Sequence, residues 1–290
     1  MHPAQSEQFL LQFQPAHWTP AGKFLRFLGP PFKPSRGLNE AIQSCADHIR
    51  KFETFAAMAA ELGPKLTLDR VELENNGFSP ANRSRQFAAL IEVLVCELYS
   101  VLDGIRYTTF HIYRRMQGVQ SSSTSKLFSR ASDGSYDKDF PGELLAMFKV
   151  AYGDWFLELQ RLRTAFTHGG LGSCWLSQDR TRISYMNSSL GSDAVAHVIP
   201  DIVSHINSFA TAVFKLVHDF FEYHYGRLAN EDSDQFCGIF KGRAYMRKVK
   251  PESQMEWDSG VCVSREWFDK ERDFKCPLAH ECAAYRRTVA

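Results

Sequence analysis

The chain has 290 residues, a formal net charge of +1 and 44% hydrophobic residues. Such a composition can bury a large core, which excludes a wholly disordered chain. The near balance of acidic and basic residues argues against a protein that coats nucleic acid over its whole surface, although it allows a local basic patch.

The sequence predicts neither a secretory signal nor a membrane span. The apolar run Phe9-Leu10-Leu11 has no basic stretch before it, and Glu92 and Glu97 interrupt the most apolar window, residues 87–99. The seven cysteines are scattered along the chain. We therefore expect a cytoplasmic protein with reduced thiols and no membrane partner.

The first part of the chain predicts an arm and two long helices. Residues 1–37 are rich in proline and predict an extended arm, held to the body by its aromatic side chains. Apolar residues recur every three or four positions over 37–62, which predicts a helix. Residues 64–80 predict a connector, with one strand as an option and a turn at Asn76-Gly77. The helical spacing then returns over about 81–117.

The remainder of the chain predicts two more long helices. Residues 118–139 are serine-rich and predict a loop, after which a helix spans about 141–168. Residues 174–186 predict a small hairpin, and apolar residues at helical spacing predict a fourth helix over about 192–226. The last segment, 227–290, shows no long periodicity.

Together these elements predict an all-α fold. We expect a bundle of about four long helices with an irregular C-terminal elaboration and one small hairpin. The predicted domains are an arm over 1–37, a helical domain over 38–226 and the elaboration over 227–290.

A short basic motif lies at the end of the third long helix. Residues 161–170 read RLRTAFTHGG, so four residues separate Arg163 from His168 and two glycines follow. Residues five apart in a regular helix lie about 140° apart around its axis, so these two side chains converge on one phosphate only if the helix bends or ends there. Gly169-Gly170 predicts such an end, where the helix dipole favours a protonated histidine.

The same spacing also has an ordinary structural explanation. Arginine and histidine separated by four to six residues also occur in Arg161/His168 and Arg106/His111, and chance alone gives about two such matches in a chain of this composition. We interpret Arg106 and His111, which lie inside a long helix, as residues on separate faces. Two interpretations of Arg163 and His168 stay open: a phosphate site, or a histidine that caps the helix end with an arginine paired to a core acid.

A helical bundle in which a long helix ends in Arg-x4-His resembles the HEPN superfamily (higher eukaryotes and prokaryotes nucleotide-binding). The motif of that superfamily is Arg-x4–6-His, commonly with Asn, Asp or His after the arginine. Residues 90–110, LIEVLVCELYSVLDGIRYTTF, are similar to the first core helix of such domains, where an acidic residue faces the motif. The resemblance covers about residues 38–226, and Thr164 departs from the usual residue after the arginine.

This resemblance implies a metal-independent endoribonuclease of the defence (antiviral) or toxin type. It implies a homodimer with one composite cleft, RNA as the substrate, a 2′,3′-cyclic phosphate product, no cofactor, and a regulatory protein as a further partner. We expect the dimer to form through residues 155–168, whose apolar side chains exceed the need of one core. The alternative is a non-catalytic HEPN scaffold that binds a nucleotide or a protein.

The resemblance also implies roles for individual residues. The catalytic residues would be Arg163, His168 and Thr164, with Glu97 or Asp103 holding the arginine. RNA would enter along the basic side chains Arg114, Arg115, Lys126 and Arg130.

The C-terminal motif CPLAHEC raises the question of a metal site. It places Cys276, His280 and Cys282 within seven residues, and Cys262 or Cys237 would be a fourth zinc ligand. The two-residue gap between cysteines of a zinc knuckle is missing, so buried thiols and a surface histidine are the favoured interpretation, and no metal is predicted. The chain also lacks a Gly-x-Ser-x-Gly turn, a phosphate-binding glycine loop and an H-E-x-x-H motif.

Overall fold

A computed structural model describes residues 10–120, 122–192, 195–252, 254–270 and 275–287. The chain divides into two compact units: unit 2 is residues 35–220, and unit 1 consists of residues 1–34 with residues 221–290. The earliest part of the predicted arm, Ser121 of the predicted loop, residues 193–194 of the predicted fourth helix and parts of the C-terminal elaboration lie outside the described residues.

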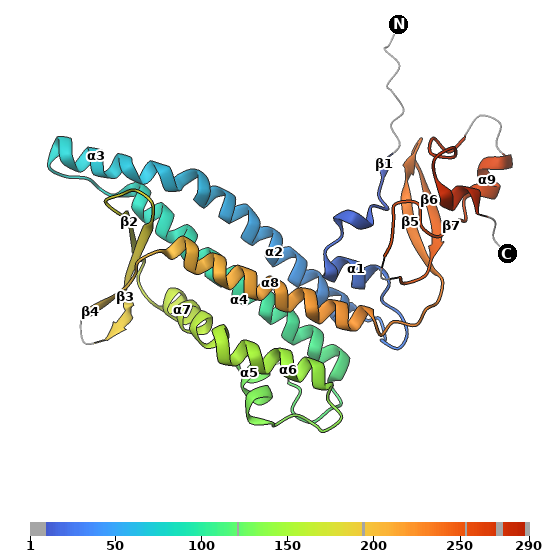
Figure 1. Ribbon diagram of the computed structural model, residues 1–290, viewed down its shortest axis with the longest axis horizontal. Helices are drawn as coiled ribbons and strands as arrows, with labels where there is room; N and C mark the ends of the chain where they lie inside the picture. Colours follow the sequence, from blue (N-terminus) through green and yellow to red (C-terminus); the bar gives the residue numbers. More distant parts are fainter. Residues whose placement is uncertain (1–9, 121, 193–194, 253, 271–274, 288–290) are drawn as a thin grey trace, which may run out of the picture. The chain divides into compact units, whose positions relative to one another are not determined.

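Three long helices form the core of unit 2. They are α2 (Arg36–Leu62), α4 (Asn82–Tyr113) and α8 (Ile202–Tyr225), whose last turn belongs to unit 1. Helices α2 and α4 lie side by side (Figure 1), and the rings of Phe52 on α2 and Phe214 on α8 meet edge to face at 5.5 Å. The apolar spacing of the sequence is therefore confirmed for these helices, except that α8 begins later than predicted.

The packing of α2 on α4 depends on one glycine. A Cβ added to Gly104 would lie 2.4 Å from Cys45 Sγ and 3.1 Å from Cys45 N, so any side chain there would collide with α2. The thiol of Cys45 is fully buried at this contact and donates to the Ala41 and Val101 carbonyls. Burial raises the pKa of this thiol.

Two further helices occupy segments predicted as connectors. Residues 64–80 contain a short turn η2 (Gly63–Lys65) and the helix α3 (Leu66–Asn76), which Gly77 ends with φ 69°. The predicted strand is therefore wrong. The serine-rich segment contains α5 (Thr124–Asp133), which begins where Ser123 Oγ accepts from Lys126 N at 3.3 Å. Helix α3 was missed because it buries only Leu66 and Asp69, so its apolar pattern is weak. Helix α5 buries Leu127, Phe128 and Ala131 at helical spacing, a signal that the serine-rich composition concealed.

The predicted helix over 141–168 is confirmed as one continuous helical run. It consists of α6 (Gly142–Ala151), the π-helical segment η3 (Tyr152–Phe156) and α7 (Leu157–His168). Single π-helical turns inside α-helices occur frequently at functional sites.

Unit 2 also contains a three-stranded antiparallel sheet. Its strands are β2 (Ser173–Leu176), β3 (Ile183–Ser192) and β4 (Val195–Ile199), in the order β2-β3-β4. The predicted hairpin corresponds to β2 and β3, while β4 lies where the fourth helix was predicted to start. One face of the sheet buries Cys174, Tyr185 and Ile199.

Unit 1 is built around a four-stranded antiparallel sheet. The strand order is β1 (Leu10–Leu11), β5 (Ser233–Phe240), β6 (Arg243–Val249) and β7 (Val261–Cys262). A two-residue turn joins β5 to β6, and both of its residues have positive φ: Lys241 at 49° and Gly242 at 73°. Short helices accompany the sheet: η1 (Pro15–His17), α1 (Pro20–Arg26), α9 (Arg265–Lys270) and α10 (Ala283–Arg286).

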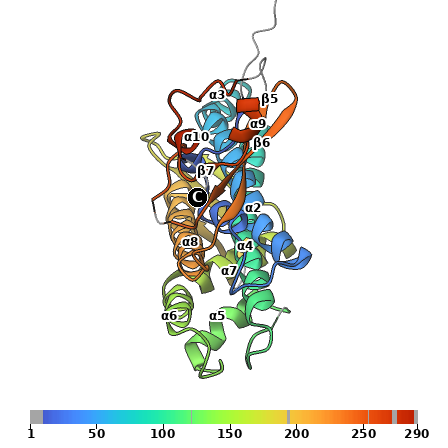
Figure 2. The ribbon, with the colours of Figure 1, turned by 90° about the vertical axis from the view of Figure 1, so that its right-hand side faces the viewer.

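The core of unit 1 is aromatic. Phe268 on α9 stacks on Tyr245 of β6 with ring centroids 4.4 Å apart, and Figure 2 shows α9 beside the β5–β6 hairpin. Phe13 and Phe24, both in the segment predicted as an arm, are fully buried. This segment contains a strand and a helix as well as extended chain.

The predicted all-α fold class is therefore wrong. The protein is a mixed α and β structure with one antiparallel sheet in each unit among the described residues. The strands β1 and β7 are two residues long and leave no pattern, whereas the alternation in β5 and β6, as in RAYMRKV of β6, was present in the sequence and was not used.

Replacement of Gly104 by alanine tests the packing of α2 on α4. Alanine normally stabilises a helix interior by about 0.5–1 kcal/mol relative to glycine. At Gly104 the collision with Cys45 reverses the sign, and we expect a loss of about 1–3 kcal/mol in the free energy of unfolding. The control is Gly153→Ala in η3, where an added Cβ meets nothing within 4 Å. Urea unfolding that shows both variants equally stable would contradict the packing.

Candidate functional site

The helix α7 ends at the predicted place. His168 is its last residue, Gly169 N donates to the Ala165 carbonyl at 2.7 Å, and Gly169 leaves the helix with φ −97° and ψ −178°. A Cβ on Gly169 would lie 2.2 Å from Ser189 Oγ of β3, so a larger residue would not fit there. The side chain of His168 is exposed, and within the described part of the chain no residue hydrogen-bonds to or pairs with its ring.

Arg163 and His168 lie on different faces of α7. The helix is regular up to His168, so their five-residue separation turns the two side chains about 140° apart. The guanidinium of Arg163 lies over the ring of Tyr99 on α4, with 5.1 Å from Cζ to the ring centroid. Within one chain, Arg163 therefore packs towards α4 rather than towards the histidine.

A different arginine shares the face of His168. Arg161 and His168 are seven positions apart, which places them about 20° apart around the axis, and Thr164 lies between them along the helix. All three are exposed. Arg161 and Thr164 line an open surface pocket of about 510 Å³ together with Ser189 and Leu190 of β3. Arg161 also donates to the Leu190 carbonyl at 3.4 Å.

The two acids predicted to hold Arg163 have other partners. Glu97 Oε2 lies 2.6 Å from Nδ1 of His48 on α2. Asp103 accepts from Thr124 on α5 and lies 3.5 Å from the guanidinium of Arg106. Arg106 is itself buried, whereas the ring of His111 packs against Gly37 on α2. Arg106 and His111 therefore face different neighbours, as interpreted from the sequence.

The basic residues predicted to guide RNA lie at the end of α4 and on α5. Arg114 and Arg115 follow α4 directly and are exposed, as is Lys126 in the first turn of α5. Arg130 donates to the Gly118 carbonyl, so its guanidinium holds the loop between these helices.

The apolar residues expected to form a dimer interface are used inside the unit. Phe156 and Leu159 are fully buried, and Phe166 is 8% exposed. Trp155 is half-buried and meets the ring of Phe128 at 6.4 Å. Leu157, at the start of α7, is 50% exposed. Most of the apolar surface expected at the dimer interface is therefore used inside the unit, and a homodimer stays a prediction.

A buried polar network fixes the loop that follows α7. Glu92 Oε1 on α4 accepts from the Tyr185 hydroxyl at 2.6 Å and from Gly172 N at 2.8 Å. Asn187 Nδ2 donates to the Tyr185 hydroxyl and to the Gly170 carbonyl, both at 2.9 Å. The ring of Tyr185 occupies the space that a side chain on Gly172 would need, 2.4 Å from the added Cβ. The sequence marked Glu92 only as a charge within an apolar window, and its role was missed.

The C-terminal cysteines lie in unit 1 as free thiols. Cys282 is buried, Cys262 and Cys276 are half-buried, and His280 is exposed. Burial raises the pKa of Cys262 to about 11, which favours the protonated thiol. In the described ranges, no three histidine, cysteine or acidic side chains gather closely enough to hold a metal ion.

Comparisons with known proteins do not place the chain in a family. No family model matches it, and no curated protein or solved structure matches it either. Across the described ranges, no helix combines the length and the apolar character that crossing a membrane requires.

Tyr185 provides a test of the network through the pH dependence of stability. Burial, and then the hydrogen bond to Glu92, raise the pKa of Tyr185 above its ordinary value. Above about pH 10 the unfolded chain loses this proton while the folded chain keeps it, so the free energy of unfolding falls by up to about 1.4 kcal/mol per pH unit. Below that pH the contribution is fully present.

In the Tyr185→Phe variant, the free energy of unfolding should no longer show this part of its decrease above about pH 10. The variant should also be less stable at neutral pH, by about 1–3 kcal/mol, because Glu92 and Asn187 lose a partner. Urea unfolding between about pH 9 and pH 11.5 measures both effects. The control is Tyr107→Phe, at an exposed tyrosine on α4. Identical alkaline slopes in the two variants would show that the Tyr185 hydroxyl is not held as described.

Proposed function

We propose that unit 2 cleaves RNA at the exposed end of α7, as the resemblance to the HEPN superfamily implies. One observation supports this most: Arg161, Thr164 and His168 lie exposed on one helix face, beside an open pocket. A phosphate needs a cationic or hydroxyl donor, and strand cleavage needs a group that moves a proton. This face offers both.

The proposed reaction is a transesterification. An imidazole accepts the proton of the ribose 2′-hydroxyl, and the 2′-oxygen attacks the adjacent phosphorus. The bond from phosphorus to the 5′-oxygen breaks, and a protonated group gives that oxygen a proton. The products are a 2′,3′-cyclic phosphate and a 5′-hydroxyl end. In a homodimer, two copies of His168 would supply the base and the acid, without a metal or cofactor.

The geometry favours Arg161 and Thr164 for the proposed phosphate contact. A guanidinium can hold a phosphate through two parallel hydrogen bonds, and Arg161 shares the face of His168. Arg163, the arginine expected from the motif, lies over Tyr99. RNA would approach along Arg114, Arg115 and Lys126. The proposal belongs to a cytoplasmic protein, in which the seven thiols stay reduced.

A second candidate function is a non-catalytic scaffold that binds a protein. The outer face of the β2-β3-β4 sheet favours it, because Trp175, Met186 and Val198 are 41%, 38% and 44% exposed there. Adjacent exposed apolar side chains of this kind mark protein interaction sites.

Replacement of His168 by alanine separates the two functions. Loss of a proton-transfer group lowers a cleavage rate by about 10²–10⁴-fold. Because the side chain is exposed at a helix end, the variant should keep the stability of the wild type. The assay follows end-labelled RNA in the presence of a chelator and identifies the cyclic phosphate. The control is His218→Ala, at an exposed histidine on α8. Equal cleavage by wild type and His168→Ala, or no cleavage by either, would contradict RNA cleavage at His168 and favour the scaffold function.

The same assay decides which arginine binds the phosphate. Lysine keeps the charge but loses the two-pronged contact. Arg161→Lys should therefore slow cleavage by about tenfold or more, while Arg163→Lys should have a smaller effect. A larger loss of cleavage rate in Arg163→Lys than in Arg161→Lys would indicate that Arg163 binds the phosphate.

A further inference from the structure

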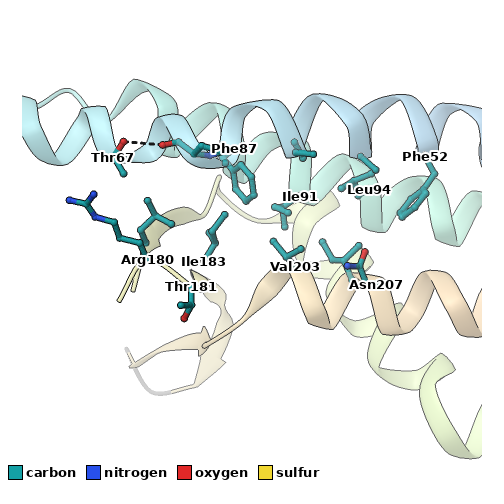
Figure 3. A pocket seen from close by; sticks show the side chains of 17 residues that line it. Phe52, Thr67, Phe87, Ile91, Leu94, Arg180, Thr181, Ile183, Val203 and Asn207 are labelled. Atoms are coloured by element: carbon teal, nitrogen blue, oxygen red, sulfur yellow. Dashed lines mark hydrogen bonds between the residues drawn. The ribbon is translucent and has the colours of Figure 1, made fainter. Parts of the chain in front are cut away.

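Unit 2 holds a cavity of about 570 Å³ that the proposed function does not use (Figure 3). It lies between α2, α4, the start of α8 and the turn that joins β2 to β3. Its size falls in the range of about 300–1,000 Å³ that is typical of small-molecule sites.

The interior of the cavity is apolar. Its walls are mainly aliphatic and aromatic side chains, in particular Phe52, Phe87, Ile91, Leu94, Ile183 and Ile206. Figure 3 shows Phe87, Ile91 and Leu94 in a row that ends at Phe52. Thr67 offers little to a ligand there, because its hydroxyl donates to the Pro64 carbonyl at 2.9 Å. Asn207 is the amide side chain of this lining, so a sugar or a nucleobase would still leave most of its buried polar groups without partners. The interior therefore fits a hydrocarbon chain.

The end of the cavity opposite Phe52 carries a positive charge. Arg180 and Thr67 lie at this end in Figure 3, and Arg180 is the charged residue of the lining. Among the residues that the structure describes, none hydrogen-bonds to or pairs with its guanidinium. The turn around it is fixed, since Ser177 N donates to the Arg182 carbonyl at 2.9 Å and Thr181 N donates to Asp179 at 3.1 Å.

We infer that this cavity binds a fatty acid. The hydrocarbon chain lies along Phe87, Ile91 and Leu94, and the carboxylate meets the guanidinium of Arg180. Arg180 is exposed at the mouth of the cavity, where a carboxylate can accept two parallel hydrogen bonds from it while the hydrocarbon chain stays inside. The site is separate from the exposed face of α7, so fatty-acid binding can be tested independently of RNA cleavage.

Fluorescence of dansyl-labelled undecanoic acid, added to the full chain, tests the inference. We expect saturable binding of one probe per chain and its displacement by dodecanoate. Dodecanol, with the same chain and no charge, should displace it about tenfold less well. Absence of saturable probe binding would overturn the site, and equal displacement by dodecanol would overturn the role of the carboxylate.

Two variants locate the bound probe. Arg180→Gln should weaken probe binding about tenfold or more, while Arg182→Gln, two residues along the same turn and outside the lining, should not. Ala56→Trp adds an indole to the α2 wall and should block binding while its circular dichroism stays that of the wild type. Unchanged probe affinity in both Arg180→Gln and Ala56→Trp would place the probe elsewhere and overturn the inference.

Discussion

The carboxylate of Glu92 connects three parts of unit 2 that are far apart in the sequence. It lies on α4, accepts a hydrogen bond from Tyr185 on β3, and accepts another from the backbone of Gly172 in the loop after α7. Hydrogen bonds to a charged acceptor are stronger than those between neutral groups, and more so away from water. The position of the α7 end relative to the sheet, and therefore the surroundings of His168, depend on this carboxylate.

The β2–β3 hairpin contributes to both candidate sites. At one end, Ser189 and Leu190 flank the exposed face of α7 that carries Arg161 and His168. At the other end, the turn holds Arg180 at the mouth of the apolar cavity. Because the inner face of the hairpin is fixed to α4 through Tyr185 and Cys174, the two sites share one rigid frame although they use different side chains.

The long helices were predictable because each buries a continuous apolar stripe, as α4 does from Phe87 to Ile105. The end of α7 was predictable because Gly169-Gly170 follows His168 directly. Helix α3 was not, since only Leu66 and Asp69 are buried on it, and its sequence therefore lacks a helical stripe. The β5–β6 hairpin left one unused signal, a Lys-Gly pair between alternating apolar residues. His48, the partner of Glu97, and Thr124, one of the two partners of Asp103, come from α2 and α5, and no local pattern specifies such long-range pairs.

Site-resolved hydrogen exchange at the Gly172 amide tests the role of Glu92 most directly. This amide lies in a loop, and its hydrogen-bond acceptor is the Glu92 carboxylate. The structure predicts a protected amide in the wild type, and in Glu92→Ala an exchange rate at least about tenfold faster while the amides of α4 stay protected. Exchange of Gly172 at the rate of an unstructured peptide in the wild type, or protection that persists in Glu92→Ala, would contradict the account.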